Sequence, residues 1–399
     1  MWILAFNCGS SSLKFELLQL DARGLRQGVS HTGKVEEIGP NARAEFAAAP
    51  TPALTSHPEA ARFALGWLKQ TAPEPMRELG GVVHRVVHGG TNLWEPALID
   101  DAVMSAIEQA GALAPLHNPP ALETIRAVGQ QLPDTPAVVV TDTGFHRTLP
   151  SYAFTYPLAR ELSARHAIRR YGFHGIGHSY MAQRWYELAG RQAQGSALIT
   201  LHLGAGCSVC AIRDGCSVDT SMGMTPLEGL MMATRAGDLD PAIPGFLIQR
   251  EQLSPAALDQ LLNHRAGLLG VSAVSGDLRE VMAAAADGNR EAKLAVDIFC
   301  YRARKYIGAY LAVLGRADAI VFGGGIGENA APVRAQICSG LENLGIALDP
   351  ELNQASDGGD RCISAPTVPI QIWIIPLDEE LQMARAALAL LTPSHLAAC

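Results

Sequence analysis

The stretch MWILAFNCGSSSLKFELLQL, residues 1–20, has the pattern of a β-hairpin. Two apolar runs, 2–6 and 13–20, flank a turn of glycine and serine, which are residue types that favour tight connections between strands. The turn also gathers Asn7, three hydroxyl groups and Lys14. It is either an ordinary solvated loop or a phosphate cradle, in which small residues let backbone N–H groups approach an anion and a lysine adds positive charge.

The same pattern returns in ALITLHLGAGCSVCAIRDG, residues 197–215. An apolar strand, a small-residue turn, a second apolar strand and a second turn follow in the same order and at similar lengths. Two such hairpins indicate a duplicated core in which each hairpin begins a domain. We therefore expect an α/β protein with two related halves.

A third glycine turn lies in ADAIVFGGGIGENAAPVRAQICSGL, residues 317–341. The run 319–322 predicts a buried strand and 331–341 has helical spacing, so 323–329 connects a strand to a helix. The spacing GxGxG is a weak dinucleotide fingerprint, and the absence of GxxxxGK[ST] excludes a P-loop enzyme. Three glycine turns in two repeated halves resemble instead the actin-like sugar kinase and Hsp70 architecture.

Length and charge narrow the classes of protein further. A chain of 399 residues favours two domains. A net charge of −8 argues against non-specific binding to nucleic acid or a membrane, and no apolar run is long enough to span a bilayer. Eight cysteines without a secretion signal indicate reduced thiols in the cytoplasm. Cys207 and Cys210 form a CxxC that lacks a second pair, so we assign no metal–thiolate site.

Charged and histidine side chains stand in unusual contexts along the chain. One buried arginine or histidine is more often structural than catalytic, because an unpaired buried charge is expensive. Several of them in glycine- or proline-rich motifs indicate a site for anionic chemistry. The motifs are GVVHRVVHGG with Arg85, LAPLHNPP with His117, AVVVTDTGFH with Asp142, RRYGFHGIGH with His174, and MTPLEGLMMATRAGDLDP with Arg235.

Taken together, the motifs resemble those of the acetokinase family over essentially the whole chain. NCGSSSLKF, HRVVHGG, APLHNPP, DTGFH, YGFHG, TPLEGLMM, TRAGDLDP, GGGIGEN and PLDEEL occur in the family's order. The resemblance implies a duplicated actin-like (ribonuclease H-like) α/β fold with nucleotide bound in the cleft between two domains. It places residues 1–146 with 382–399 in the N-terminal domain, where the last helix returns, and 147–381 in the C-terminal nucleotide-binding domain.

The resemblance also implies an activity. The family reversibly phosphorylates acetate with ATP, giving acetyl phosphate and ADP by direct in-line transfer, with Mg²⁺ or Mn²⁺ as cofactor. A cytoplasmic homodimer that binds neither nucleic acid nor membranes is implied as well. Phosphoryl transfer depends mainly on positioning and charge neutralisation, which suits two arginines.

Each site residue has an implied role. Arg85 holds the carboxylate, Arg235 stabilises the transferring group and His174 donates a hydrogen bond to it, whereas Asp142 either moves a proton or orients its neighbours. Val87, Leu116, Phe173 and Pro226 surround the acyl methyl group, beside His117. Asn7 and Glu379 correspond to magnesium positions. The ATP-binding residues are Ser10, Ser12, Lys14, His202, Leu203, Gly204, Ala205, Gly206, Asp277, Leu278, Arg279, Gly325, Ile326, Gly327, Glu328 and Asn329.

The sequence departs from the family pattern near the phosphates. Ala205 stands where the family has an amide side chain, and Ile176 and Gly177 replace two hydroxyl residues beside His174. Gly144 replaces a common alanine, and 377–378 replace a Thr-Asn pair. We expect an active enzyme with weaker nucleotide binding. The alternatives are a propionate kinase, a non-catalytic nucleotide-binding regulatory protein, and a pyrophosphate-dependent variant, which Gly325 and Ile326 disfavour.

Overall fold

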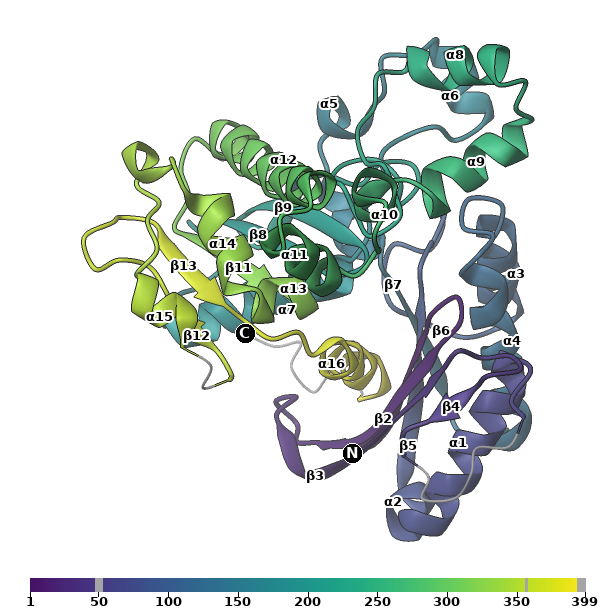
Figure 1. Cartoon of the computed structure of the whole chain (residues 1–399). Coiled ribbons are helices and arrows are strands. Elements are labelled where there is room, and N and C mark those ends of the chain that lie inside the picture. The colour runs from purple at the N-terminus through teal and green to yellow at the C-terminus, as the bar shows by residue number, and fades with distance from the viewer. Residues whose placement is uncertain (47–52, 356–357, 393–399) are drawn as a thin grey trace. The chain divides into compact units, whose positions relative to one another are not determined.

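The computed structural model of the chain describes residues 1–46, 53–355 and 358–392. The chain forms two compact units. Unit 1 comprises Met1–Phe145 and Asp378–Cys399, and unit 2 comprises His146–Leu377. Each unit is built on one mixed β-sheet covered by helices (Figure 1).

The sheet of unit 1 has the strand order β4-β3-β2-β1-β5-β7-β6. Strand β1 pairs antiparallel with β2 and parallel with β5, and β5 pairs parallel with β7. The strands are β1 (Trp2–Cys8), β2 (Leu13–Leu20), β3 (Arg26–Glu36), β4 (Arg43–Ala44), β5 (Leu79–Val86), β6 (Ala97–Leu98) and β7 (Ala137–Thr141). The helices are α1 (His57–Thr71), α2 (Pro73–Arg77), α3 (Asp101–Ala110), α4 (Asn118–Gln131) and α16 (Glu379–Leu391).

The sheet of unit 2 has the strand order β10-β9-β8-β11-β13-β12. Its strands are β8 (Ala197–Leu203), β9 (Cys207–Arg213), β10 (Cys216–Thr220), β11 (Ala319–Gly323), β12 (Arg361–Cys362) and β13 (Gln371–Ile374). Its helices are α5 (Ser151–Phe154), α6 (Arg160–Arg165), α7 (Gly175–Ala189), α8 (Ala242–Arg250), α9 (Pro255–His264), α10 (Gly267–Ser272), α11 (Leu278–Ala286), α12 (Arg290–Leu314), α13 (Gly324–Asn329), α14 (Ala331–Cys338) and α15 (Pro350–Gln354). Short 3₁₀ helices form at Gly144–Thr148 and Glu342–Leu344.

The two sheets confirm the predicted duplication. In each, the first strand lies between the second strand, with which it pairs antiparallel, and a later strand, with which it pairs parallel: β1 between β2 and β5, and β8 between β9 and β11. The next parallel strand, β7 or β13, then pairs with a two-residue antiparallel edge strand, β6 or β12. The hairpins quoted from the sequence therefore occupy equivalent positions, and the predicted duplicated α/β fold is correct.

The helix that follows each set of strands packs on the other sheet. Helix α7 follows β7 in the chain and contacts β8 and β11, whereas α16 follows β13 and contacts β1 and β5. The apolar face of α16, with Leu381, Ala384 and Leu388, is buried there. Figure 1 shows α16 on the side of the unit 1 sheet opposite to α1 and α4.

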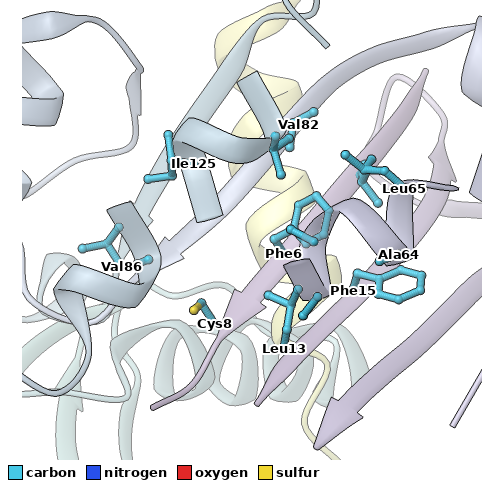
Figure 2. Close-up of a cluster of buried hydrophobic side chains, with 14 of the residues drawn as sticks. Phe6, Cys8, Leu13, Phe15, Ala64, Leu65, Val82, Val86 and Ile125 are labelled. Carbon is cyan, nitrogen blue, oxygen red and sulfur yellow. The ribbon is translucent and has the colours of Figure 1, made fainter. Parts of the chain in front are cut away.

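The alternation of side chains along β1 divides the unit 1 core into two layers. Leu4, Phe6 and Cys8 join a buried cluster with Leu65 of α1 and Ile125 of α4, part of which appears in Figure 2. The alternate residues of β1 point to the other face, because successive side chains of a strand point to opposite sides. The strand therefore presents Asn7 on the α16 side, at the end of the strand.

Candidate functional site

In unit 1 the first group of polar residues lies where β1 and β5 end. The guanidinium of Arg85 binds the carboxylate of Asp142 through two bonds, Nε to Oδ1 at 2.8 Å and Nη2 to Oδ2 at 2.5 Å. Its Nη1 donates to Oδ1 of Asn7 at 2.8 Å. Burial opposes the charge of Arg85, but the carboxylates of Asp142 and Glu379 outweigh that effect and raise the pKa of Arg85.

This geometry bears on the two roles considered for Asp142. Its side chain is 1% exposed, and both of its oxygens accept hydrogen bonds from Arg85. A carboxylate held in this way neutralises and orients the guanidinium, so the arrangement favours the orienting role over proton transfer. Three of the five N–H groups of Arg85 take part in the bonds to Asp142 and Asn7.

Carboxylates gather at the N-terminus of α16. The Nδ2 of Asn7 donates to Oε2 of Glu379 and to Oε1 of Glu380, both at 3.1 Å. Burial, and then repulsion from Glu379, raises the pKa of Glu380. Carboxylate oxygens of Glu16, Asp378 and Glu380 also lie within 4.8 Å of one another. The predicted magnesium residues Asn7 and Glu379 are therefore together, among more acidic groups than the sequence analysis identified.

The glycine-serine turn of unit 1 is compact. The N–H of Gly9 donates to the carbonyl of Ser12 at 2.8 Å, and a Cβ on Gly9 would lie 2.6 Å from Oγ of Ser12. Ser10 is exposed. Lys14 is also exposed and pairs across the hairpin with Asn7, which places Lys14 on the α16 side of the sheet.

The acyl-pocket residues predicted in unit 1 lie on two loops that one side chain ties together. The amide of Asn118 accepts from the N–H of His88 at 3.1 Å and donates to its carbonyl at 2.9 Å. Asn118 thereby joins the loop of Val87, which is buried, to the loop of Leu116 and His117. Leu116 is half-exposed. Asn118 stood in the quoted APLHNPP motif, but its role was not predicted.

In unit 2 most of the predicted nucleotide residues line one cavity of about 810 Å³. The cavity is lined by Gly204, Ala205, Asp277, Leu278, Arg279, Gly325, Ile326 and Asn329, with Ala233, Gly276, Met282, Ala330 and Pro332. The last five were not predicted, and their small or apolar side chains carry no sequence signal. A Cβ on Gly325 would meet nothing within 4 Å, so this glycine borders open space.

Five of the nucleotide residues predicted in unit 2 do not line this cavity: His202, Leu203, Gly206, Gly327 and Glu328. The last two make hydrogen bonds within the neighbouring turn. The carboxylate of Glu328 accepts from the N–H of Gly324 at 2.9 Å and from that of Leu377 at 3.1 Å. Gly327 is buried, and its carbonyl accepts from Arg334 at 2.9 Å. Both residues therefore shape the turn that borders the cavity.

The cavity ends at the turn between β8 and β9, residues 204–206, where a second group of polar residues lies. The ring of His174 stacks on that of His202, with centroids 4.0 Å apart. A Cβ on Gly206 would lie 3.3 Å from Nε2 of His174 and 3.8 Å from Nη1 of Arg235. The carbonyl of Ala205, which lines the cavity, accepts from the N–H of Ala233 at 3.1 Å. The predicted residues His174, His202 and Arg235 thus meet at the turn that closes the cavity.

Arg235 carries a charge without a carboxylate partner among the residues that the structure describes. Its Nη1 donates to the carbonyl of Pro226 at 3.1 Å and lies 3.8 Å from the sulfur of Met232. Burial lowers the pKa of Arg235. Phe173, predicted with Pro226 for the acyl pocket, is almost fully buried in the same unit.

Two polar residues beside His174 were missed by the sequence analysis. Ser208 follows the turn on β9, and His178 lies one helical turn beyond His174 on α7. Both stood in quoted motifs, but nothing in their spacing showed that they meet.

Cys207 and Cys210 are free, buried thiols of β9. In the described part of the chain, no helix is long and apolar enough to span a membrane.

Comparisons with known proteins agree with this geometry. The model of the Acetokinase family matches residues 2–385. The chain is 44% identical over 395 residues to an acetate kinase of Dictyoglomus turgidum and 45% identical over 390 residues to one of Desulfitobacterium hafniense. These alignments cover 96% of this chain and 96% and 98% of the relatives.

Solved structures give the same result. The crystal structure of an acetate kinase from Porphyromonas gingivalis is 37% identical with a TM-score of 0.89, covering 98% of this chain and all of that one. A propionate kinase from Francisella tularensis is 38% identical with a TM-score of 0.88, covering 96% of this chain and 98% of that one. The predicted actin-like fold class and the resemblance are thereby confirmed, and the chain belongs to the acetokinase family.

Proposed function

We propose that this chain is an ATP-dependent acetate kinase. It transfers the γ-phosphoryl group of ATP to the carboxylate of acetate and runs reversibly. The observation that carries the proposal is the junction in unit 2, where a nucleotide-sized cavity ends at a turn beside His174 and an uncompensated Arg235. A nucleotide whose adenosine occupies the cavity has its phosphates at this turn, where backbone N–H groups and a guanidinium can bind them.

The reaction follows from the charges. A carboxylate oxygen of acetate attacks the γ-phosphorus in line with the departing oxygen of ADP. The bond from the γ-phosphorus to this ADP oxygen breaks as the bond from the γ-phosphorus to the acetate oxygen forms. Negative charge spreads over the equatorial phosphoryl oxygens, so fixed cationic and N–H donors beside them lower the barrier. Arg235 and His174 supply these donors, and no proton has to leave acetate, which is ionised at neutral pH.

Arg85 serves the acceptor substrate. Its position is fixed by Asp142 and Asn7, and N–H groups remain to bind a carboxylate. We assign the methyl group of acetate to Val87, Leu116, Phe173 and Pro226, beside His117. The domain boundaries and the binding of nucleotide between the domains stay predictions.

The acidic residues at the start of α16 fit a divalent cation. Glu379 and Glu380 supply hard carboxylate oxygens, which Mg²⁺ and Mn²⁺ prefer. Asn7 donates to both carboxylates and so holds them in place. When bound, the cation neutralises charge on the nucleotide phosphates, and Glu379 is the residue that we expect to hold it.

A propionate kinase is the second candidate, because a solved propionate kinase is as similar to this chain as a solved acetate kinase. The test is an acyl-phosphate trapping assay with acetate, propionate and butyrate, each with ATP and Mg²⁺. Acetyl phosphate as the main product supports the proposal. A preference for propionate favours the second candidate, and no acyl phosphate from any acid indicates a non-catalytic protein. Replacing ATP by pyrophosphate tests the phosphoryl donor.

We also propose that the protein is a cytoplasmic homodimer that needs neither nucleic acid nor membrane. The described cysteines are free thiols and the net charge is −8. Light scattering coupled to gel filtration measures the mass of the assembly, and a monomer contradicts the dimer.

A further inference from the structure

The ring of His174 is attached to a buried hydrogen-bond chain. His174 and His178 lie four residues apart and therefore on one face of the chain entering α7. Nδ1 of His174 and Nε2 of His178 both bind the Oγ of Ser208, at 2.9 Å and 2.7 Å. Nδ1 of His178 binds Oγ1 of Thr200 at 2.7 Å. Thr200, His178 and Ser208 are all fully buried.

The direction of these hydrogen bonds can be worked out by counting protons. Burial lowers the pKa of His178 well below its usual value, so its ring is neutral and carries one N–H. Among the described residues, the hydroxyl of Thr200 has only Nδ1 of His178 as a hydrogen-bond partner. A buried donor without an acceptor is costly, whereas a hydroxyl lone pair without a donor costs less. Thr200 therefore donates to Nδ1 of His178.

The directions of the other two hydrogen bonds follow from this one. His178 then carries its proton on Nε2 and donates to Ser208. Ser208 has a single hydroxyl proton, which is left to bond Nδ1 of His174. Because Nδ1 accepts this bond, the proton of the neutral His174 ring lies on Nε2, the nitrogen near Gly206 and Arg235.

We propose that Thr200, His178 and Ser208 form a relay that positions His174 and keeps its proton on Nε2. This inference rests on the proposed phosphoryl transfer, in which an N–H donor is needed beside the Gly206 turn and a nitrogen lone pair there would repel the phosphoryl oxygens. The backbone of His174 is left-handed, with φ at +57°, a conformation uncommon for a residue other than glycine. Such conformations persist where surrounding contacts hold them, as the relay does here.

The first test is the position of the proton in the wild-type protein. Two-bond ¹H–¹⁵N spectra of histidine-labelled protein at neutral pH distinguish the two tautomers, and the His174→Gln variant assigns the signal. We expect Nε2 to be protonated and Nδ1 to accept. A proton on Nδ1 of neutral His174 overturns the relay. This result does not depend on activity, whereas a wild type that phosphorylates no carboxylic acid contradicts the proposed function instead.

The second test is kinetic. Ser208→Ala should lower kcat by about 10- to 100-fold, because a small displacement of a reacting group is expensive, while the KM values for ATP and acetate change by less than about 3-fold. Ser208→Thr retains the hydroxyl and should recover most of kcat. Ser217→Ala is the matched control, because Ser217 is equally buried and its Oγ bonds Nδ1 of His146 at 2.8 Å, not His174.

The control should keep kcat close to wild type even if it lowers stability. If Ser208→Ala and Ser217→Ala reduce kcat equally, the loss is structural and the positioning role is wrong. If Ser208→Ala fails to fold, the tautomer measured in the wild type still decides the question.

Discussion

Two arginines of the candidate site have opposite electrostatic surroundings. The charge of Arg85 is balanced within unit 1 by Asp142, and its carboxylate partner is in place before any substrate binds. Arg235 has no carboxylate partner among the described residues and donates to a backbone carbonyl. A guanidinium placed in this way interacts most strongly with charge that arrives or develops during the reaction.

Replacing Arg235 should therefore affect turnover more than binding. We expect Arg235→Ala to lower kcat by about 10³-fold or more, the range for an arginine that stabilises a phosphoryl-transfer transition state, with a much smaller change in the KM for ATP. Arg235→Lys keeps the charge but loses the planar fork, so it should recover kcat only partly. Steady-state kinetics of acetyl phosphate formation measure both variants. A kcat near that of wild type for Arg235→Ala would show that the site has been assigned wrongly.

Val87 should set the size of the acyl group. It is buried and β-branched, so its methyl groups cannot easily move aside for a longer chain. One additional methylene in an apolar pocket changes kcat/KM by roughly 10- to 200-fold, and we expect wild type to prefer acetate by a factor near the low end. Val87→Ala should narrow or invert this preference without changing the KM for ATP. Competition assays with acetate and propionate measure the ratio, and equal changes in ATP use and acyl selectivity would contradict the pocket.

At the scale of elements, β5 and α16 are in close contact. A Cβ on Gly81 of β5 would lie 2.2 Å from Cδ1 of Leu391 on α16. Nothing local in β5 calls for glycine here, because the φ of Gly81 is not positive. The residue is small because the helix lies on that face of the sheet, and the same contact surface holds Glu379 beside Asn7.

This contact predicts a coupling between strand and helix. Gly81→Ala should destabilise the protein by about 1–3 kcal/mol, the usual cost of overpacking. In the Leu391→Ala background the same substitution should cost much less, because the clashing methyl group has been removed. Urea denaturation of the four proteins gives the coupling energy, and additive effects would mean that α16 does not pack there.

A matched control comes from α1. Gly66 lies within this helix, and a Cβ there would meet nothing within 4 Å. Gly66→Ala should therefore be neutral or stabilise by up to about 1 kcal/mol, since alanine favours helices.

At the scale of the whole molecule, both units bury neutral histidines. Burial lowers the pKa of His84 in unit 1 to about 3 and that of His146 in unit 2 to about 4. His84 stacks on Phe6 in the core, with ring centroids 5.5 Å apart. The histidines of the unfolded chain have pKa values near 6.5. Below this pH the unfolded chain therefore binds protons at these two side chains, whereas the folded chain does not. These groups therefore destabilise the fold as the pH falls below about 6.5.

His84→Phe should remove part of this pH dependence. Above pH 6.5, His84 does not lower the free energy of unfolding. Between pH 6.5 and the pKa of His84 in the folded protein, it lowers the free energy of unfolding by about 1.4 kcal/mol for each unit that the pH falls. Phenylalanine keeps a ring against Phe6 and cannot be protonated. Free energies of unfolding at pH 5, 6 and 7 should fall less steeply for the variant than for wild type. Parallel curves would mean that the pKa of His84 is the same in the folded and the unfolded chain.

Short contiguous segments of the sequence determined much of the architecture. The two hairpins, the strand-to-helix turn at 323–329 and the cavity-lining stretches beginning at Gly204 and Asp277 each occupy a few contiguous residues. Period-two alternation and small-residue turns are properties of such short segments, so their repetition showed the duplicated core.

Only the tertiary structure decided how the polar residues are partnered. Asp142 neutralises Arg85 because β5 and β7 pair in one particular register, and Glu328 turns inward to hold Gly324 and Leu377. Ser208 reaches His174 because β9 lies beside the start of α7. Side-chain hydrogen bonds depend on distances of a few ångströms between segments far apart in the chain, and strand register and helix packing set those distances, whereas the composition of a motif does not.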